Sequence, residues 1–250
     1  MRAEQGIPSA ILLDAFGTLV ALEPPAPALR AELARRFEIE VSEAQAQRAI
    51  AAEIAYYRAH LDEGRDEASL ACLRGRCAEA LRAALGGSAA IARVGREALT
   101  AALLASLRFT AFADVEPAIT AARARGQRIV AVSNWDISLT DVLGRLHLAQ
   151  RLDGIVTSAQ VGARKPSAEI FVRALSVAGV APADAVHVGD SVDEDVVGAR
   201  SAGIEPILIR RDGRPGPAGV RTIASLAELS LLEAHPPSPD LERPPRRREP

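Results

Sequence analysis

Short apolar runs recur along the chain, with helix-like stretches between them. Each run has four or five residues, which fits a buried strand and is too short for an independent helix. The runs are residues 10–13, 129–132, 154–157, 185–188 and 205–209. From Phe112 onward the intervening segments have helical spacing near 112–125, 138–148, 167–178 and 193–202. This alternation predicts an α/β fold: a parallel sheet covered by helices on both faces.

The pattern between the first and second apolar runs is helical throughout. Residues 23–27 hold three prolines, and alanine- and arginine-rich segments with almost no β-branched runs follow them. The predicted helices are 28–37, 42–60, 66–86 and 90–107, with breaks at Gly64 and at Gly86-Gly87. We therefore expect a helical domain over 23–111, inserted into an α/β core formed by 7–22 and 112–234.

The last segment of the chain, residues 235–250, differs from both. It holds six prolines and the run Arg246-Arg247-Arg248. Such a segment is too polar and too rich in proline to bury a core, so we expect a disordered tail.

The amino-acid composition limits the kinds of molecule that the protein is expected to bind. The chain has 250 residues, 48% apolar and 25% charged, with 30 basic and 32 acidic residues and a net charge of −2. A balanced charge disfavours binding to nucleic acid or to an anionic membrane, and no apolar run approaches the ~18 residues of a membrane span. Cys72 and Cys77 match no common zinc or redox spacing. We expect a cytoplasmic monomer or homodimer that binds a small anionic substrate.

Polar and glycine residues gather where the predicted strands end. In open α/β sheets, ligands bind beyond the carboxyl ends of the strands, so these segments are expected to form one site. Within them, Lys165 is the single lysine in a chain with 29 arginines, which favours a position that needs a compact point charge. The segments are Asp14-Ala15-Phe16-Gly17-Thr18, Ser133-Asn134, Arg164-Lys165-Pro166, and Gly189-Asp190-Ser191 through Asp195.

In this order the four segments resemble the motifs of the haloacid dehalogenase superfamily of hydrolases, whose members are mostly phosphatases. The resemblance runs from about residue 11 to residue 230. It implies a Rossmann-like core with an inserted helical cap, and it matches Asp14 to the nucleophile and Lys165 to the third-motif cation. It also matches Ser133 to the second-motif hydroxyl, and Asp190 with Asp195 to the acidic pair of the fourth motif.

The residue types agree with phosphoryl transfer. A carboxylate cannot approach a phosphate dianion unassisted, so Asp14 needs a divalent cation and Lys165 to offset the repulsion. We expect Mg²⁺, held by Asp14, Asp190, the backbone carbonyl of Phe16 and waters, with Asp195 one shell further out.

Three further groups are expected to bind the transferred group. Hydrogen-bond donors directed at its oxygens would stabilise the charge that develops there. The donors are the hydroxyls of Thr18 and Ser133 and the amide of Asn134.

One position departs from the phosphatase pattern. Two residues after the nucleophile, phosphatases of the superfamily carry a second Asp as general acid and base, whereas this chain has Phe16. Such a group contributes about 10²–10⁴-fold. The 2-haloacid dehalogenases of the superfamily also carry an aromatic residue there, because a halide leaves without a proton. Those enzymes use no metal and replace the leading acid of the fourth motif, whereas this chain keeps Asp190.

We therefore expect a phosphatase-type hydrolase that is slow or restricted to good leaving groups, or one that takes its acid from the cap. The alternatives are a dehalogenase that works through an Asp14 ester, and a non-catalytic relative that binds a phosphorylated ligand or a partner. His60 is a conceivable donor from the cap, or an exposed histidine beside packed tyrosines. His187 is expected to be a satisfied core histidine, and Asp136 a helix cap.

Overall fold

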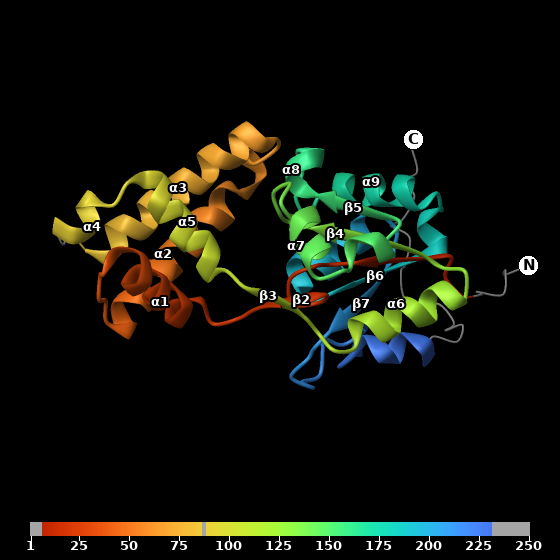
Figure 1. The fold of residues 1–250 in the computed structure, drawn as a ribbon. Helices are drawn as coiled ribbons and strands as arrows, with labels where there is room; N and C mark the ends of the chain where they lie inside the picture. The colour runs from red at the N-terminus through yellow and green to blue at the C-terminus, as the bar shows by residue number, and fades with distance from the viewer. Residues whose placement is uncertain (1–6, 87–88, 232–250) are drawn as a thin grey trace, which may run out of the picture.

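The computed structural model describes residues 7–86 and 89–231, so the tail expected at 235–250 lies outside the described residues. An α/β unit and a helical unit lie side by side and are joined by a pair of thin connections (Figure 1). The predicted α/β class is confirmed: the larger unit contains a six-stranded sheet in which every pair of neighbouring strands is parallel.

The first strand of the chain lies inside this sheet, between the second and fourth apolar runs of the sequence. The strand order is β5-β4-β1-β6-β7-β8, and Leu13 is in register with Ala131 on one side and Val188 on the other. The carboxyl ends of β4, β1 and β6 therefore meet at one edge. The strands are β1 (Ala10–Leu13), β4 (Arg128–Ser133), β5 (Gly154–Thr157), β6 (Ala185–Gly189), β7 (Glu205–Ile209) and β8 (Arg221–Ile223).

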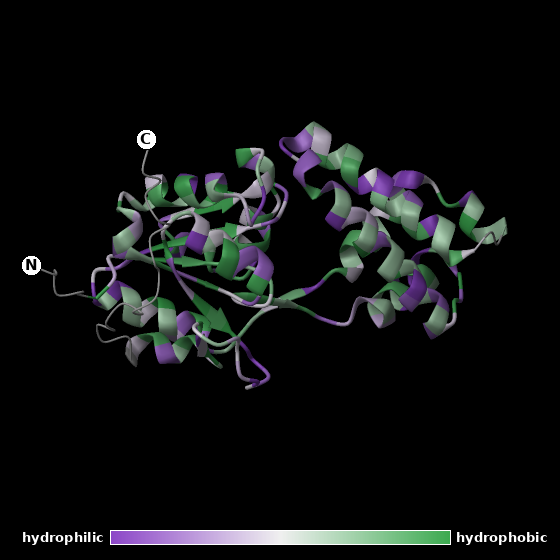
Figure 2. Cartoon of the chain, turned by 180° about the vertical axis from the view of Figure 1, so that it is seen from behind, coloured by the Kyte–Doolittle hydropathy of each residue, from purple (hydrophilic) through white to green (hydrophobic). Residues whose placement is uncertain are grey.

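Helices cover both faces of the sheet, which explains why its strands are apolar on both sides (Figure 2). Ile11 and Leu13 pack with α6 (Val115–Ala124), α7 (Leu139–Arg145) and the 3₁₀ segment η5 (Leu226–Leu231). The alternate residues of β1 pack on the other face. That face carries α8 (Ser158–Val161), α9 (Ala168–Ala178) and α10 (Val197–Ser201), and α10 follows a π-helical turn at Val192–Val196.

The helical unit has a hydrophobic core of its own, in which Leu33, Leu73 and Leu99 are fully buried. The helix predicted over 90–107 is interrupted at Gly95, and the first helix begins at Pro25 because proline is tolerated in the first helical turn. The helices are α1 (Pro25–Phe37), α2 (Glu43–His60), the 3₁₀ turn η1 (Leu61–Glu63), α3 (Glu67–Leu85), α4 (Ala89–Arg93) and α5 (Arg96–Ser106).

The two connections pair with each other as a short antiparallel ribbon of β2 (Val20–Leu22) and β3 (Phe109–Ala111). The chain leaves the sheet through β2 and returns through β3, so the helical unit is inserted directly after the turn that follows β1. This ribbon was not predicted, since three residues are too few to show a strand period.

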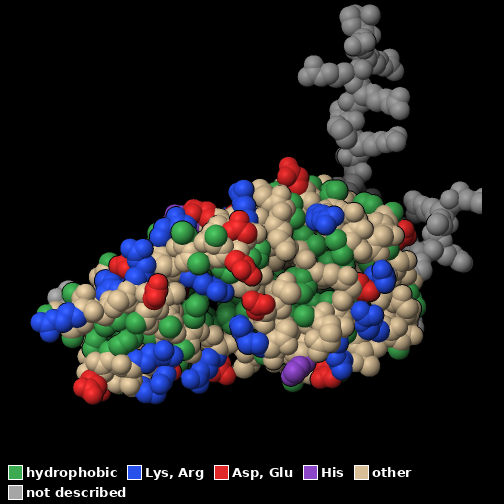
Figure 3. Space-filling view, turned by 45° about the horizontal axis from the view of Figure 1, so that its top comes forward, with side chains coloured by type: hydrophobic (Ala, Val, Ile, Leu, Met, Phe, Trp, Pro, Cys, Tyr) green, Lys and Arg blue, Asp and Glu red, His purple; other side chains and the backbone are tan. Residues whose placement is uncertain are grey.

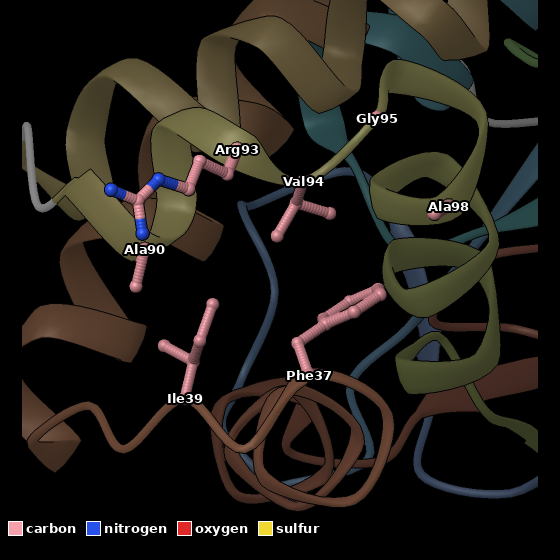
Figure 4. Close-up of a pocket in the computed structure, with 7 residues that line it drawn as sticks. All are labelled: Phe37, Ile39, Ala90, Arg93, Val94, Gly95 and Ala98. Atoms are coloured by element: carbon pink, nitrogen blue, oxygen red, sulfur yellow. The ribbon is translucent and has the colours of Figure 1, made fainter.

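A surface pocket of about 450 Å³ opens within the helical unit, between the end of α1 and the α4–α5 connection (Figure 4). Its lining is apolar apart from Arg93. Because α4 lies at the end of the helical unit that is remote from the sheet, this pocket is separate from the strand ends (Figure 1).

Charges of both signs are interspersed over the face seen in Figure 3, in agreement with the balanced composition. Within the described residues, no helix is both long enough and apolar enough to span a membrane.

Candidate active site

The predicted nucleophile lies where the sheet edge is most crowded. Asp14 directly follows β1, and its backbone N–H extends the ladder by donating to the carbonyl of Val188 at 2.9 Å. Its side chain is buried, with 5% exposure. The hydroxyl of Ser133, at the end of β4, donates to Asp14 Oδ1 at 3.0 Å. The first and second sequence segments are therefore in direct contact.

The lone lysine lies between two carboxylates. Lys165 Nζ is 2.6 Å from Asp14 Oδ1 and 2.6 Å from Asp195 Oδ1, and the whole side chain is buried. Burial alone would lower the pKa of this ammonium, but the attraction of both carboxylates outweighs burial and raises it. Lys165 is therefore charged, and it connects the first, third and fourth segments.

The two carboxylates that share Lys165 have pKa values shifted in opposite directions. Burial raises the pKa of Asp14 to about 7, and the nearby Asp195 and Asp190 oppose the lowering effect of Lys165. Burial also acts on Asp195, but Lys165 and a hydrogen bond from His187 hold the pKa of Asp195 well below its usual range. Asp195 is therefore the ionised partner of Lys165, whereas burial and the crowding of negative charge raise the pKa of Asp14.

A third carboxylate completes the cluster. Ligand oxygens of Asp14, Asp190 and Asp195 all lie within 4.8 Å of one another, and Asp190 is the exposed member. Partial burial and the neighbouring Asp195 raise the pKa of Asp190. Three carboxylates face a single buried ammonium, so the cluster could be balanced by a further cation or by a proton on one of the carboxylates.

The turn after Asp14 brings the other first-segment residues to this edge. The Ala15 carbonyl accepts from the backbone N–H groups of Leu19 and Val20 at 2.8 and 2.9 Å, and Gly17 has a φ of +82°. Thr18 is fully buried, and its hydroxyl has no partner among the described residues. Donation by that hydroxyl to the transferred group stays a prediction. Phe16 is 40% exposed.

Asn134 has a structural role that the sequence did not indicate. Its side-chain Oδ1 accepts from the Lys165 backbone N–H at 2.7 Å, and its Nδ2 donates to the Lys165 carbonyl at 3.1 Å. The side-chain amide thus fixes the lysine's backbone. Donation by an amide of Asn134 to the transferred group stays a prediction.

His187 is buried in β6, as expected of a core histidine, but it also contacts the site. Its Nε2 lies 2.9 Å from Asp195 Oδ1, the oxygen that also accepts from Lys165. Burial lowers the pKa of His187 despite the opposing effect of Asp195. The neutral ring therefore donates from Nε2 and holds Asp195 beneath the lysine.

His60 is not brought to the strand ends by any contact among the described residues. Its Nδ1 lies 2.7 Å from the Tyr56 carbonyl of its own helix, and the two rings stack with centroids 4.1 Å apart. Asp136 accepts from the Ser138 backbone N–H at 2.7 Å, but the N-cap of α7 is Ser138 and has no side-chain cap, so the predicted capping role of Asp136 is wrong: its carboxylate closes the turn that precedes the helix.

The helical unit contacts the sheet edge through pairs of residues that the sequence did not predict to be in contact. Tyr57 donates to Asp136 Oδ2 at 3.0 Å. Asp62 of η1 accepts from Ser158 Oγ at 2.5 Å and from Arg164 Nε at 2.7 Å. Arg164 directly precedes Lys165, so the two units meet beside the buried cluster. No local sequence signal marks these pairs, since their partners are about 80 to 100 positions apart.

Comparison with known proteins finds relatives that are named as hydrolases and phosphatases. The chain is 36% identical over 132 residues to haloacid dehalogenase-like hydrolase domain-containing protein 3 of Mus musculus, covering 49% of this chain and 53% of that protein. It is 35% identical over 120 residues to glyceraldehyde 3-phosphate phosphatase of Methanopyrus kandleri, covering 45% and 52%. The chain spans about a third to about half of the length of the curated relatives it matches.

The fold is also found in solved structures. A HAD phosphatase from Thermococcus onnurineus superposes with a TM-score of 0.61 at 23% identity, covering 90% of this chain and 98% of that one, and this likeness concerns the fold. A family model described as haloacid dehalogenase-like hydrolase matches residues 8–203, which hold all four strand-end segments. The chain therefore belongs to the haloacid dehalogenase-like hydrolases.

Proposed function

We propose that this hydrolase is a magnesium-dependent phosphatase that cleaves a small phosphorylated metabolite through an aspartyl-phosphate on Asp14. The observation that carries the proposal is the contact of one buried lysine with two carboxylates, beside a third that is exposed. A metal-free dehalogenase site would have to tolerate Asp190 beside an ionised nucleophile and a carboxylate substrate, because nothing else would neutralise it.

The cluster fits Mg²⁺ by its chemistry. Magnesium prefers hard oxygen ligands, and the exposed Asp190 leaves the site open to solvent, from which waters can complete the shell. Asp14, Asp190 and the backbone carbonyl of Phe16 would hold the ion, while Asp195 stays bound to Lys165. When bound, Mg²⁺ would neutralise the carboxylates and polarise the phosphoryl oxygens.

The chain's own residues account for the displacement. The Asp14 carboxylate attacks phosphorus, so that a bond forms from Asp14 to the phosphoryl group and the bond to the leaving oxygen breaks. Lys165 neutralises charge on the phosphoryl oxygens, and the hydroxyls of Thr18 and Ser133 donate to them. Water then cleaves the acyl phosphate, which releases inorganic phosphate and restores Asp14.

Phe16 limits the range of leaving groups. Its side chain can neither give a proton to the departing oxygen nor take one from the attacking water. The proposal therefore favours substrates whose leaving group departs as a stable anion. We propose further that the helical unit is a cap whose η1 contacts with Ser158 and Arg164 exclude water while the substrate is bound.

One observation favours a second function. The aromatic ring two positions after Asp14 suits a halide leaving group, and a 2-haloacid dehalogenase would form an ester on Asp14. The two functions differ in their demand for metal, since the three carboxylates would hinder binding of a 2-haloacid unless a cation were present.

The test compares product release under two conditions. We would measure phosphate release from p-nitrophenyl phosphate and glyceraldehyde 3-phosphate, and halide release from 2-chloropropionate, each with Mg²⁺ and with EDTA. Glyceraldehyde 3-phosphate is included because of the name of the 35%-identical relative. Magnesium-dependent phosphate release that disappears in Asp14→Asn supports the proposal. Halide release in EDTA would replace it with the dehalogenase.

A further inference from the structure

Arg211, which lies two residues beyond β7 and outside the four strand-end segments, reaches the turn that follows the nucleophile. Its Nε donates to the Gly17 carbonyl at 3.1 Å, and its Nη2 donates to the Thr18 carbonyl at 2.5 Å. The remaining nitrogen, Nη1, lies 3.2 and 3.0 Å from the two carboxylate oxygens of Asp114. All three guanidinium nitrogens therefore have a partner.

The same guanidinium also stacks on an aromatic ring. Its central carbon lies 3.6 Å from the centroid of the Phe112 ring. Phe112 and Asp114 belong to the segment that returns from β3, whereas Gly17 and Thr18 lead into β2. Arg211 thus links the two connections to the helical unit where they leave the α/β unit. One of them begins with residues 15–20, the turn that follows Asp14.

Only arginine can make this set of contacts. A planar fork can donate in three directions while its face rests on a ring, whereas the lysine ammonium is a compact point charge that cannot stack in the same way. The partner carboxylate is itself held in place, because Asp114 Oδ2 also accepts from Ser225 Oγ at 2.7 Å and from the Leu226 backbone N–H at 2.8 Å. Asp114, and through it Arg211, is therefore hydrogen-bonded to the start of η5.

The clamped turn carries three groups that the proposed reaction uses. These are the Phe16 carbonyl, the Gly17 backbone that lies against Asp190, and the Thr18 hydroxyl. The position of each depends on the conformation of residues 15–20. Within the turn, the Ala15 carbonyl accepts the backbone N–H groups of Leu19 and Val20, so the carbonyls of Gly17 and Thr18 are left for Arg211.

We infer that Arg211 is a positioning residue: by holding the Gly17 and Thr18 carbonyls, it fixes the turn over residues 15–20 and the two connections to the helical unit in one arrangement. Its effect on catalysis rests on the proposed function, but its effect on the turn does not. Groups that orient metal ligands from outside typically change metal affinity by ~10–100-fold when they are removed.

The primary test is hydrogen exchange in the full-length protein without metal. We would compare Arg211→Gln and Arg211→Lys with Arg214→Gln, a control that makes the same Arg→Gln change on the same loop at a side chain that is exposed to solvent. We expect amides of residues 15–20 to exchange about tenfold faster or more in both Arg211 variants and to be unchanged in the control. Unchanged exchange in this turn would overturn the inference.

Comparing hydrogen exchange in residues 15–20 with exchange in β7 distinguishes a positioning role of Arg211 from general stabilisation of the fold. If Arg211 merely stabilised the fold, exchange would rise in residues 15–20 and in β7 to the same extent, and that outcome would also overturn the inference. Arg211→Lys keeps the charge and provides a readout if Arg211→Gln fails to fold.

The catalytic consequence is measured on the same variants. The Mg²⁺ concentration for half-maximal phosphatase activity should rise ~10-fold or more in Arg211→Lys and stay within about twofold in Arg214→Gln. If the wild-type protein releases no phosphate from any substrate, the proposed function fails, while hydrogen exchange still decides the positioning role. Faster exchange with an unchanged Mg²⁺ requirement would contradict the link to catalysis.

Discussion

A Cβ atom on Gly17 would lie 2.1 Å from Oδ2 of Asp190. The glycine therefore allows the turn after β1 and the loop after β6 to approach more closely than any other residue would permit. Its φ of +82° is a second reason for glycine at this position. The approach brings the backbone beside Phe16 to the exposed carboxylate of the proposed magnesium site.

Gly17→Ala is expected to displace Asp190 and to weaken Mg²⁺ binding by ~10-fold or more. Gly126→Ala is the matched control, because Gly126 has a φ of +76° but a Cβ there would meet nothing within 4 Å. Both variants carry the backbone strain, and only Gly17→Ala carries the clash. Calorimetric titration with Mg²⁺ compares them. Equal affinities in the two variants would show that the approach of Gly17 to Asp190 is unimportant for the metal.

The raised pKa of Asp14 predicts a pH-dependent stability. Burial raises this pKa from 3.8 to about 7, so the folded protein keeps a proton that the unfolded chain releases at lower pH. The stability due to that proton is complete below about pH 4 and is lost as the pH rises through about 7. In EDTA, Asp14→Asn should therefore be more stable than wild type at pH 8, by a few kcal/mol at most, and the difference should vanish toward pH 4.

Glu53 provides the control for this measurement. It is buried in α2, and burial raises its pKa to about 6, so ionisation of Glu53 also costs stability as the pH rises. Thermal unfolding of Glu53→Gln with and without Mg²⁺ isolates its share. Mg²⁺ should remove the pH dependence that comes from Asp14 and leave that from Glu53. A pH profile that is the same in wild type and Asp14→Asn would contradict the account.

Removal of Lys165 should be costly because it leaves buried charge unpaired. Lys165→Met is expected to lower the free energy of unfolding by ~3–5 kcal/mol at pH 8 in EDTA, and to lower kcat by ~10²-fold or more. The double variant with Asp14→Asn should lose less stability than the sum of the two single changes, since one carboxylate is then neutral. Urea titration of the four proteins gives the coupling. Strict additivity would show that Asp14 and Lys165 do not interact.

Phe16→Asp is expected to raise kcat on alkyl phosphates by ~10²-fold, because it restores a group that can protonate the leaving oxygen. The gain should be small for acetyl phosphate, whose leaving group needs no proton. Phe16→Leu is the control for loss of the ring. Because Phe16 is 40% exposed, we expect no large loss of stability in either variant. No gain on alkyl phosphates would show that the absent acid does not limit the rate.

The sequence was sufficient to predict the parts of the fold that local pattern determines. The central strands are continuous apolar runs because both faces of the sheet are covered, so each run was visible without an alignment. The β2–β3 ribbon could not be predicted, because three residues show no period and their pairing spans most of the helical unit.

Some residues of the site were likewise predictable from local sequence pattern, and others were not. The proximity of Asp14, Ser133 and Asp190 was predictable because each lies directly at a strand end, whereas Lys165, which follows α8, was marked as the single lysine of the chain. The roles of His187 and Arg211 were not predictable, since each depends on a contact with a residue that no local pattern indicates. His187 occupied a position typical of a core residue, and Arg211 was one of 29 arginines.

The most direct test of the central claim is intact-protein mass spectrometry after brief incubation with acetyl phosphate. We expect a phosphoryl adduct that requires Mg²⁺ and is absent from Asp14→Asn, because a good leaving group makes the missing acid unnecessary in the first step. The lifetime of the adduct would report how slowly water is activated in its absence. The absence of both adduct and released phosphate, or an adduct that persists in Asp14→Asn, would contradict Asp14 as a phosphoryl-accepting nucleophile.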